Sequence, residues 1–165
     1  MLDLLSRISR LTSKAALYIS VAGLVLMTAI ISWQIFARYV LNAAPAWTEP
    51  AALFLMLWFI LFAAAAGVRE GFHIRLTLVE DALSPIGRVA LRLFCHAVVG
   101  LFGAAMAGAG GSLVLATWSH VIPTLGLPRG AAYAPIVVAG ALIVLYSVER
   151  ALLELRGEEA ERAWP

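Results

Sequence analysis

Long apolar runs without any Asp, Glu, Lys or Arg dominate the pattern of the chain. They cover residues 15–37, 51–68, 93–128 and 130–148. About 20 apolar residues cross the hydrocarbon core of a bilayer, and backbone groups there must bond within their own segment. Each run therefore predicts a spanning α-helix, although Pro123, Gly126 and Pro128 end the third helix near residues 117–120. We expect an all-α membrane protein with four transmembrane helices, at about residues 15–37, 48–69, 86–118 and 131–150.

The composition supports a membrane location. Of the 165 residues, 62% are hydrophobic and 13% are charged, against about 25% charged residues in a typical soluble domain. So few charges cannot cover a soluble surface, and the high hydrophobicity also excludes intrinsic disorder. The single cysteine, Cys95, excludes an intramolecular disulfide framework and a multi-cysteine zinc site. We expect one domain, residues 1–165, in contact with the lipid bilayer, and the net charge of +2 does not indicate a nucleic-acid partner.

Lys and Arg are distributed unevenly between the two sides of the predicted helices. Ten of the twelve lie on one side, in the N-terminal segment, the connection between the second and third helices, and the C-terminal tail. Arg38 and Arg129 lie on the other side. The positive-inside rule then places both termini in the cytoplasm. The first helix follows basic residues, as in a signal peptide, but its 23 uncharged residues exceed the usual apolar region and no A-x-A site follows. We expect it to be retained.

The predicted inner connection, between the second and third helices, is long for a simple hairpin. Apolar residues recur there at every third or fourth position from Leu76 to Ile86. This spacing predicts a short amphipathic helix in the membrane plane, at about residues 73–83. Ser84 and Pro85 then suit the N-cap and first position of the third spanning helix.

The other two segments outside the membrane are simpler. The second outer connection, residues 120–130, is rich in Pro and Gly and is predicted to be irregular. The charged cytoplasmic tail, residues 151–165, is predicted to extend the fourth helix and to fray near Gly157.

Small residues repeat along the third predicted helix. Such residues let helix backbones approach closely in a membrane, where van der Waals packing replaces the hydrophobic driving force. Packing within the chain and contact with another membrane subunit both remain open. The two overlapping series are Gly100, Ala104 and Gly108, and Gly103, Ala107 and Gly111.

Residues that could carry catalysis or bind a cofactor are scarce. The sequence has no G-x-S-x-G, no glycine-rich phosphate loop and no H-E-x-x-H, so it does not indicate an enzyme. His73, His96 and His120 lie at different predicted depths, which argues against a haem or metal site between the helices. The uncharged runs also lack the buried carboxylate that an ion-coupled carrier usually needs. These features favour a scaffold or accessory subunit.

Residues 34–75 carry a specific resemblance. Gln34-Ile35-Phe36-Ala37-Arg38-Tyr39, then Asn42, Trp47 and Glu49, and later Arg69-Glu70-Gly71-Phe72-His73-Ile74-Arg75, match two motifs in order. The stretch resembles the DctQ-like small membrane subunit of tripartite ATP-independent periplasmic (TRAP) transporters, whose size and four-helix layout the whole chain shares. Two positions depart from the pattern. Pro50 stands where the family usually has a second glutamate, and Thr77 stands near a usual aspartate.

The resemblance implies a role in a bacterial inner membrane complex. A large membrane subunit would carry the substrate and sodium sites, and a soluble periplasmic binding protein would deliver the substrate, often an organic acid or sialic acid. This chain would brace the large subunit, help to dock the binding protein, and carry no cofactor, metal or substrate site itself. The alternatives are a membrane anchor of a redox complex and a stand-alone small carrier.

Two groups of residues are candidates for partner contacts or structural roles. At the outer side, Arg38 and Glu49 can pair across the hairpin as a structural clamp. At the inner side, His73 and Arg75 either snorkel toward headgroups, anchor the in-plane helix or contact the large subunit. The outer group is Arg38, Tyr39, Asn42, Trp47 and Glu49, and the inner anchor group is Arg69, His73 and Arg75.

Overall fold

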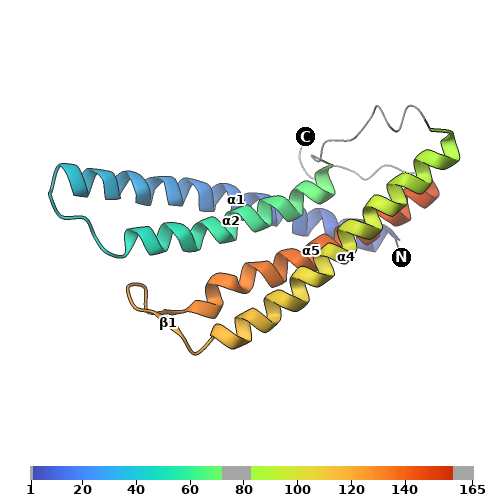
Figure 1. Ribbon diagram of the computed structural model, residues 1–165. Coiled ribbons are helices and arrows are strands. Elements are labelled where there is room, and N and C mark those ends of the chain that lie inside the picture. The colour runs from blue at the N-terminus through green and yellow to red at the C-terminus, as the bar shows by residue number, and fades with distance from the viewer. Residues whose placement is uncertain (1, 72–82, 158–165) are drawn as a thin grey trace.

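Four long helices and one small hairpin make up the structure. The computed structural model describes residues 2–71 and 83–157 (Figure 1). The elements are α1 (Leu2–Tyr39), α2 (Thr48–Glu70), α4 (Pro85–Thr117), β1 (Val121–Ile122), β2 (Leu127–Pro128) and α5 (Arg129–Arg156). Each of the four helices is long and apolar enough to cross a membrane, which confirms the predicted all-α membrane architecture. The predicted in-plane helix falls, except for Leu83, outside the described residues, as does most of the charged tail.

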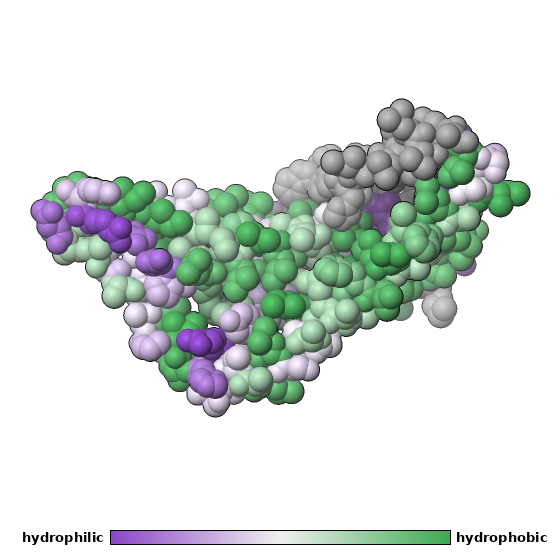
Figure 2. All heavy atoms as spheres, in the orientation of Figure 1, coloured by the Kyte–Doolittle hydropathy of each residue, from purple (hydrophilic) through white to green (hydrophobic). Residues whose placement is uncertain are grey.

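The helices form two antiparallel hairpins. α1 packs against α2, α4 packs chiefly against α5, and contacts between α2 and α5 join the hairpins. The α1–α2 connection and the β1–β2 hairpin lie at one end of the molecule, here named the turn end, and α1 begins and α5 ends at the other (Figure 1). Hydrophobic residues cover most of the face in Figure 2, whereas hydrophilic residues gather at the α1–α2 connection. This distribution suits a chain surrounded by lipid between two polar boundaries.

α1 is considerably longer than the uncharged run that predicted it. It begins at Leu2, whereas the prediction placed the first span at residues 15–37. At a rise of 1.5 Å per residue its 38 residues extend about 57 Å, well beyond a hydrocarbon core of about 30 Å. The prediction missed this segment because Arg and Lys residues end an uncharged run without ending a helix.

Glycine sets the distance between α4 and α5. A Cβ atom on Gly140 of α5 would lie 2.6 Å from the Gly103 carbonyl oxygen and 2.7 Å from the Ala107 amide nitrogen. A Cβ on Gly110 would lie 2.8 Å from Cγ2 of Ile136. Such close backbone approach is the packing mode expected of small residues in membrane helices.

The two predicted series of small residues divide between faces of α4. Gly100, Gly103 and Ala107 lie against α5, so these residues pack within the chain. Ala104 and Gly108 are exposed, and a Cβ on Gly108 or Gly111 would meet nothing within 4 Å.

The α1–α2–α5 contact is filled by small and aromatic side chains. Ala16, Phe62 and Ala66 form one buried cluster, and Ala65, Ala139, Ile143 and Tyr146 form a second. Phe54, Trp58 and Phe62 follow each other at four-residue spacing along α2, with ring centroids 6.0 and 5.9 Å apart. The spacing places these rings on one face of the helix.

The helix ends follow local signals in the sequence. The Ser84 hydroxyl accepts a hydrogen bond from the Gly87 amide with Pro85 in the first turn, which confirms the predicted cap of α4. α4 ends at Thr117, within the expected range, and α5 ends at a left-handed Gly157.

The prediction of an irregular second outer connection was wrong. Val121 pairs with Pro128 and Ile122 with Leu127 as an antiparallel hairpin, closed by Gly126 at φ 67°. Pro and Gly correctly marked a turn, but they do not report whether the residues beside the turn pair with each other.

Gly140→Ala tests the close packing of α4 and α5. The new methyl group must displace backbone atoms of α4, so we expect the unfolding free energy to fall by about 1–3 kcal/mol. Gly108→Ala is the matched control, because its methyl group enters open space and its stability should stay equal or rise by up to about 1 kcal/mol. Thermal unfolding in detergent, followed by circular dichroism, measures both. Equal stability of the two variants would contradict the packing assignment.

Candidate functional site

Charged side chains are buried together where α2 ends beside α1 and α5. Within the described residues, Arg69, Glu70 and Glu149 are the charged residues in the buried class, with 1%, 5% and 0% of their surfaces exposed. We call these three residues, with Ser13 and Arg150, the buried ion network. α1 contributes Ser13, α2 contributes Arg69 and Glu70, and α5 contributes Glu149 and Arg150. The network therefore joins three helices from distant parts of the chain.

The central contact is a two-point ion pair between Arg69 and Glu149. Nε of Arg69 lies 3.0 Å from Oε2 of Glu149, and Nη2 lies 3.1 Å from Oε1. This fork geometry fixes the orientation of both groups as well as their distance. Because the two residues are 80 positions apart, the pair holds α2 against α5.

Glu70 connects this pair to α1. Its Oε1 accepts a hydrogen bond of 2.8 Å from the Ser13 hydroxyl and lies 3.4 Å from Nη1 of Arg69. Ser13 is fully buried. A buried carboxylate needs such donors, because its charge has lost the hydration it would have in water.

The second cation of the network, Arg150, contacts the backbone at the end of α2. Its Nη2 donates a hydrogen bond to the Arg69 carbonyl oxygen. This carbonyl belongs to the last turn of α2, where unpaired carbonyl groups attract cations. Gly71 ends the helix at φ 74°, and its amide donates to the Gly67 carbonyl at 3.1 Å. The Arg-Glu-Gly sequence thus places both charged side chains in the final turn before the chain leaves the helix.

A neighbouring contact ties α1 to α5 directly. The Tyr146 hydroxyl on α5 donates to Oγ1 of Thr12 at 3.1 Å, and Thr12 in turn bonds the Ile8 carbonyl at 2.9 Å. Tyr146 is fully buried and also belongs to the apolar cluster of α2 and α5. Polar and apolar contacts therefore converge on one side chain.

The geometry favours a structural role for the buried ion network over substrate binding. Both carboxylates are engaged by groups of the same chain, and the cations Arg69 and Arg150 balance their charges. A buried ion pair contributes little net stability compared with apolar packing, but losing one partner costs about 3–5 kcal/mol. Such a network therefore penalises any arrangement of α1, α2 and α5 that separates its members.

The sequence-based prediction captured only part of this site. Arg69 was expected as an inner anchor, and the structure buries it against Glu149. His73 and Arg75 lie outside the described residues, as does Thr77. Four network members were missed: Ser13, Glu70, Glu149 and Arg150.

A signal for the ion pair was present in the sequence. Arg69 ends the second uncharged run and Glu149 ends the fourth, so the predicted topology brings opposite charges to one depth on the same side.

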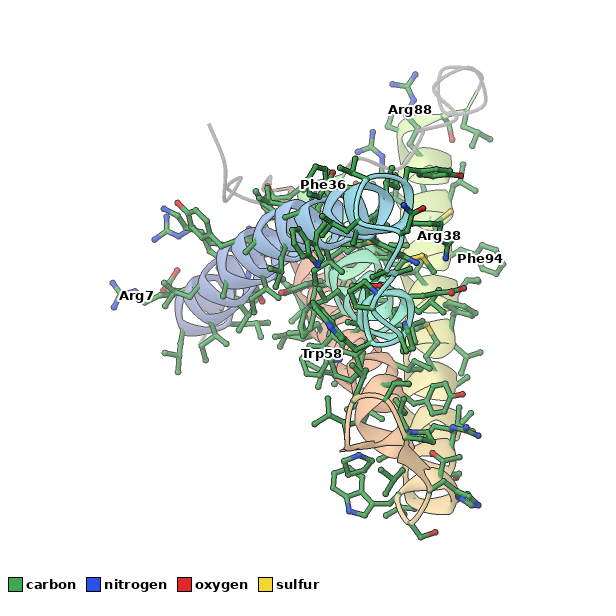
Figure 3. The ribbon with its side chains drawn as sticks, turned by 90° about the vertical axis from the view of Figure 1, so that its left-hand side faces the viewer. Arg7, Phe36, Arg38, Trp58, Arg88 and Phe94 are labelled. Atoms are coloured by element: carbon green, nitrogen blue, oxygen red, sulfur yellow. The ribbon has the colours of Figure 1, made fainter. Side chains whose placement is uncertain are left out.

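The predicted outer residues share one property, which is exposure at the turn end. Figure 3 looks onto this end and shows Arg38 in the last turn of α1. No ion pair joins Arg38 to Glu49 among the described residues, so the predicted clamp is not formed in this structure. Both residues are exposed, where water solvates each charge and an ion pair gains little free energy. The exposed residues are Arg38, Tyr39, Asn42, Trp47 and Glu49.

Backbone contacts shape the α1–α2 connection instead. Asn42 adopts a left-handed conformation at φ 51°, which Asn tolerates better than most residues. The Ala43 amide bonds the Ala37 carbonyl at 3.0 Å, and the buried Thr48 hydroxyl donates to the Pro45 carbonyl at 2.8 Å. These bonds hold the loop through its backbone and the Thr48 side chain.

Metal-ligating residues do not gather in the described part of the chain. No group of three or more His, Cys, Asp or Glu side chains is close enough there to hold a metal ion. His96 is half-buried on α4 and His120 is exposed before β1.

Comparison with known proteins assigns the chain to a family. Residues 27–157 match the family model of tripartite ATP-independent periplasmic transporters, DctQ component. The chain belongs to the DctQ family. The match includes the exposed α1–α2 connection and the Arg69–Glu149 pair, and it starts after Ser13. A family member with four membrane-spanning helices is a multi-pass protein of the inner membrane.

Two relatives of this DctQ-family chain agree with the assignment. A Haemophilus influenzae protein, named as a TRAP transporter small permease protein, is 22% identical over 138 residues, covering 84% of this chain and 86% of the relative. The sialic acid TRAP transporter small permease protein SiaQ of Vibrio cholerae is 29% identical over 75 residues, covering 46% and 43%.

Glu149→Ala tests the central ion pair. The change leaves the buried guanidinium of Arg69 without its two-point partner, so we expect a loss of about 3–5 kcal/mol in unfolding free energy. Arg69→Leu combined with Glu149→Leu removes both charges and should recover most of that loss. Glu154→Ala, which breaks the half-exposed pair with Arg92, is the control and should cost at most about 1 kcal/mol. A Glu149→Ala protein as stable as Glu154→Ala would show that the pair does not hold the helices.

Ser13→Ala tests the link to α1. Glu70 loses a buried donor, so we expect the unfolding free energy to fall by about 1–3 kcal/mol. Ser32→Ala, at an exposed position of the same helix, should change it by less than about 0.5 kcal/mol. Repeating Ser13→Ala in a Glu70→Gln background completes a double-mutant cycle. A coupling energy of zero would refute the Ser13–Glu70 contact.

Proposed function

We propose that this chain is the scaffold of a TRAP transporter: it braces the large membrane subunit and helps to dock the periplasmic binding protein. The observation that carries the proposal is the buried ion network, which fixes α1, α2 and α5 relative to one another. A subunit that supports a moving partner needs this resistance to rearrangement. Both carboxylates of the network are bonded within the chain, which argues against their binding a transported cation.

The orientation that fits this role has both termini in the cytoplasm. The basic residues concentrate on the side where α1 begins, as the positive-inside rule requires of a cytoplasmic side. The turn end then faces the periplasm with Arg38, Asn42 and Glu49 exposed. A soluble binding protein could reach these side chains directly, and the polar surface suits a transient contact.

The substrate and ion chemistry belongs, in this proposal, to the large subunit. That partner would couple inward movement of an organic acid to a sodium gradient, and this chain would remain without cofactor or substrate. The Vibrio cholerae relative is named for sialic acid, which makes sialic acid one substrate to test along with simple dicarboxylates.

Co-purification tests the scaffold proposal. The chain is expressed with the large membrane subunit from the same source, and one tag on this chain is used to isolate the complex in detergent. We expect the large subunit to be retained by the wild-type chain and lost with Glu149→Ala. A stable, monodisperse chain that never retains the large subunit would refute the proposal and favour the stand-alone carrier. Haem absorbance in the purified sample would favour the redox-complex anchor.

Charge reversal at the turn end tests the docking proposal. We expect Glu49→Lys to lower sodium-driven uptake of the organic acid at least tenfold, measured in vesicles that hold the complete transporter. A partner surface that binds the Glu49 carboxylate is positively charged, so it would repel the lysine. Thr124→Lys adds a lysine to the exposed β1–β2 hairpin and should leave uptake within twofold.

Two measurements separate docking from other causes in these variants. Because Glu49 also lies in the first turn of α2, thermal unfolding must show that its reversal leaves the fold intact. Raising the concentration of binding protein should restore uptake if docking is impaired. Uptake by Glu49→Lys equal to wild type would contradict the role of this side chain.

A further inference from the structure

The first turns of α1 extend beyond the end of α2. The Ser13–Glu70 hydrogen bond fixes Ser13 at the depth of the last turn of α2. Residues 2–12 of α1 therefore continue past that turn, by about 16 Å at the helical rise of 1.5 Å per residue. The segment carries Arg7, Arg10 and Lys14 and directly precedes the uncharged run of residues 15–37, so its composition fits the boundary of the hydrocarbon core.

One face of this segment is covered by the rest of the chain. Ser9 and Ser13 are fully buried, and Ala16 and Ser20 continue the same face along α1. The four residues follow helical spacing, so they form one stripe against the bundle. Thr12 lies beside this stripe and contacts Tyr146, and the opposite side of residues 2–14 is exposed.

The outward surface divides into a basic stripe and an apolar stripe. Arg7, Arg10 and Lys14 are exposed at i, i+3 and i+7, which places them on one side. Leu4 and Leu11 form the apolar stripe, with 63% and 62% of their surfaces exposed. Ile8 lies beside them and is 44% exposed. The segment carries one acid, Asp3, so its side chains sum to +2.

Basic and apolar stripes side by side are the pattern of a helix at a membrane surface. The apolar side chains enter the boundary between headgroups and acyl chains, and the basic side chains bind the anionic headgroups. Figure 3 shows Arg7 at a free edge of α1, on a different side of the molecule from Arg88 at the start of α4. No described helix covers this edge.

We propose that residues 2–14 of α1 form a binding surface for anionic phospholipid headgroups. Arg7 and Lys14 contact the phosphate groups, and Leu4, Ile8 and Leu11 enter the adjacent acyl region. Charge complementarity favours lipid over a protein partner: two or more basic residues beside an exposed leucine stripe match an anionic leaflet, which attracts each such residue near its surface. The surface lies at the opposite end of the chain from the α1–α2 connection.

Lipid retention tests the charge contribution. The full chain is purified from membranes, exchanged into mixed micelles of phosphatidylglycerol and phosphatidylcholine, and its bound lipids are counted by native mass spectrometry. Arg7→Gln should lower the retention of phosphatidylglycerol about fivefold, the change that corresponds to about 1 kcal/mol per basic residue. Arg7→Gln combined with Lys14→Gln should lower it further. Arg129→Gln, at the turn end, is the matched control and should leave retention unchanged.

Fluorescence tests where the apolar stripe lies. In a Cys95→Ser background, a cysteine at Leu11 is labelled with an environment-sensitive dye and the full chain is reconstituted alone in vesicles of the same two lipids. We expect blue-shifted emission that spin-labelled lipids quench. Leu4→Cys provides a second site if Leu11→Cys does not fold, and circular dichroism checks the helix content of each variant.

Three results would overturn the proposal. The first is phosphatidylglycerol retention that Arg7→Gln leaves unchanged, and the second is retention that Arg129→Gln lowers equally. The third is a dye that stays in water in the chain alone and becomes shielded only when the large membrane subunit is added. That last result would assign the surface to a protein partner.

Discussion

The Arg69–Glu149 ion pair is the contact on which the arrangement of the helices depends. The two α-hairpins meet mainly where α2 packs on α5, and this pair closes that contact with two hydrogen bonds of 3.0 and 3.1 Å. Membrane helices gain no hydrophobic driving force from packing together, since lipid is as apolar as the helix surface, so a preference for one rotation and depth must come from shape or from directional polar contacts. A buried, two-point ion pair has such a preference, because sliding or rotating either helix leaves a charge without its partner.

Elsewhere in the molecule, some helix pairs are held mainly by close packing and others by polar contacts as well. Along α4 and α5, glycine allows the two backbones to touch, so this contact depends on complementary shape more than on polar groups. Where α1, α2 and α5 meet, Ser13, Glu70 and Tyr146 add directional bonds to the apolar clusters. α4 thus joins the bundle mainly through α5, whereas α1, α2 and α5 are tied to one another. A partner subunit would meet a fixed unit of three helices with α4 beside it.

How much the sequence could predict follows from what each signal measures. Uncharged runs report hydrophobic length, and they located all four helices, whereas Pro123, Gly126 and Pro128 indicated the end of α4. The runs could not show that α1 starts at Leu2, because a helix continues through Arg7 and Lys14 once its serine face is buried. The motif of residues 34–75 identified the family, and residues 27–157 match its model. Side-chain partners were harder: Arg38 and Glu49 are close in sequence yet unpaired in the described structure, whereas Arg69 and Glu149 pair across 80 residues.

The same turn of α1 serves the buried ion network and the outer surface. Ser13 faces Glu70 inside the bundle, and the adjacent Lys14 is exposed on the outside. Residues 2–12 of α1 continue past this turn, and in the lipid proposal they enter the headgroup region. There, the exposed leucines would enter the acyl boundary, and Arg7 and Lys14 would meet anionic headgroups. The hydrogen bond that fixes Ser13 beside Glu70 therefore also fixes how far the basic and apolar stripes of residues 2–14 extend beyond α2.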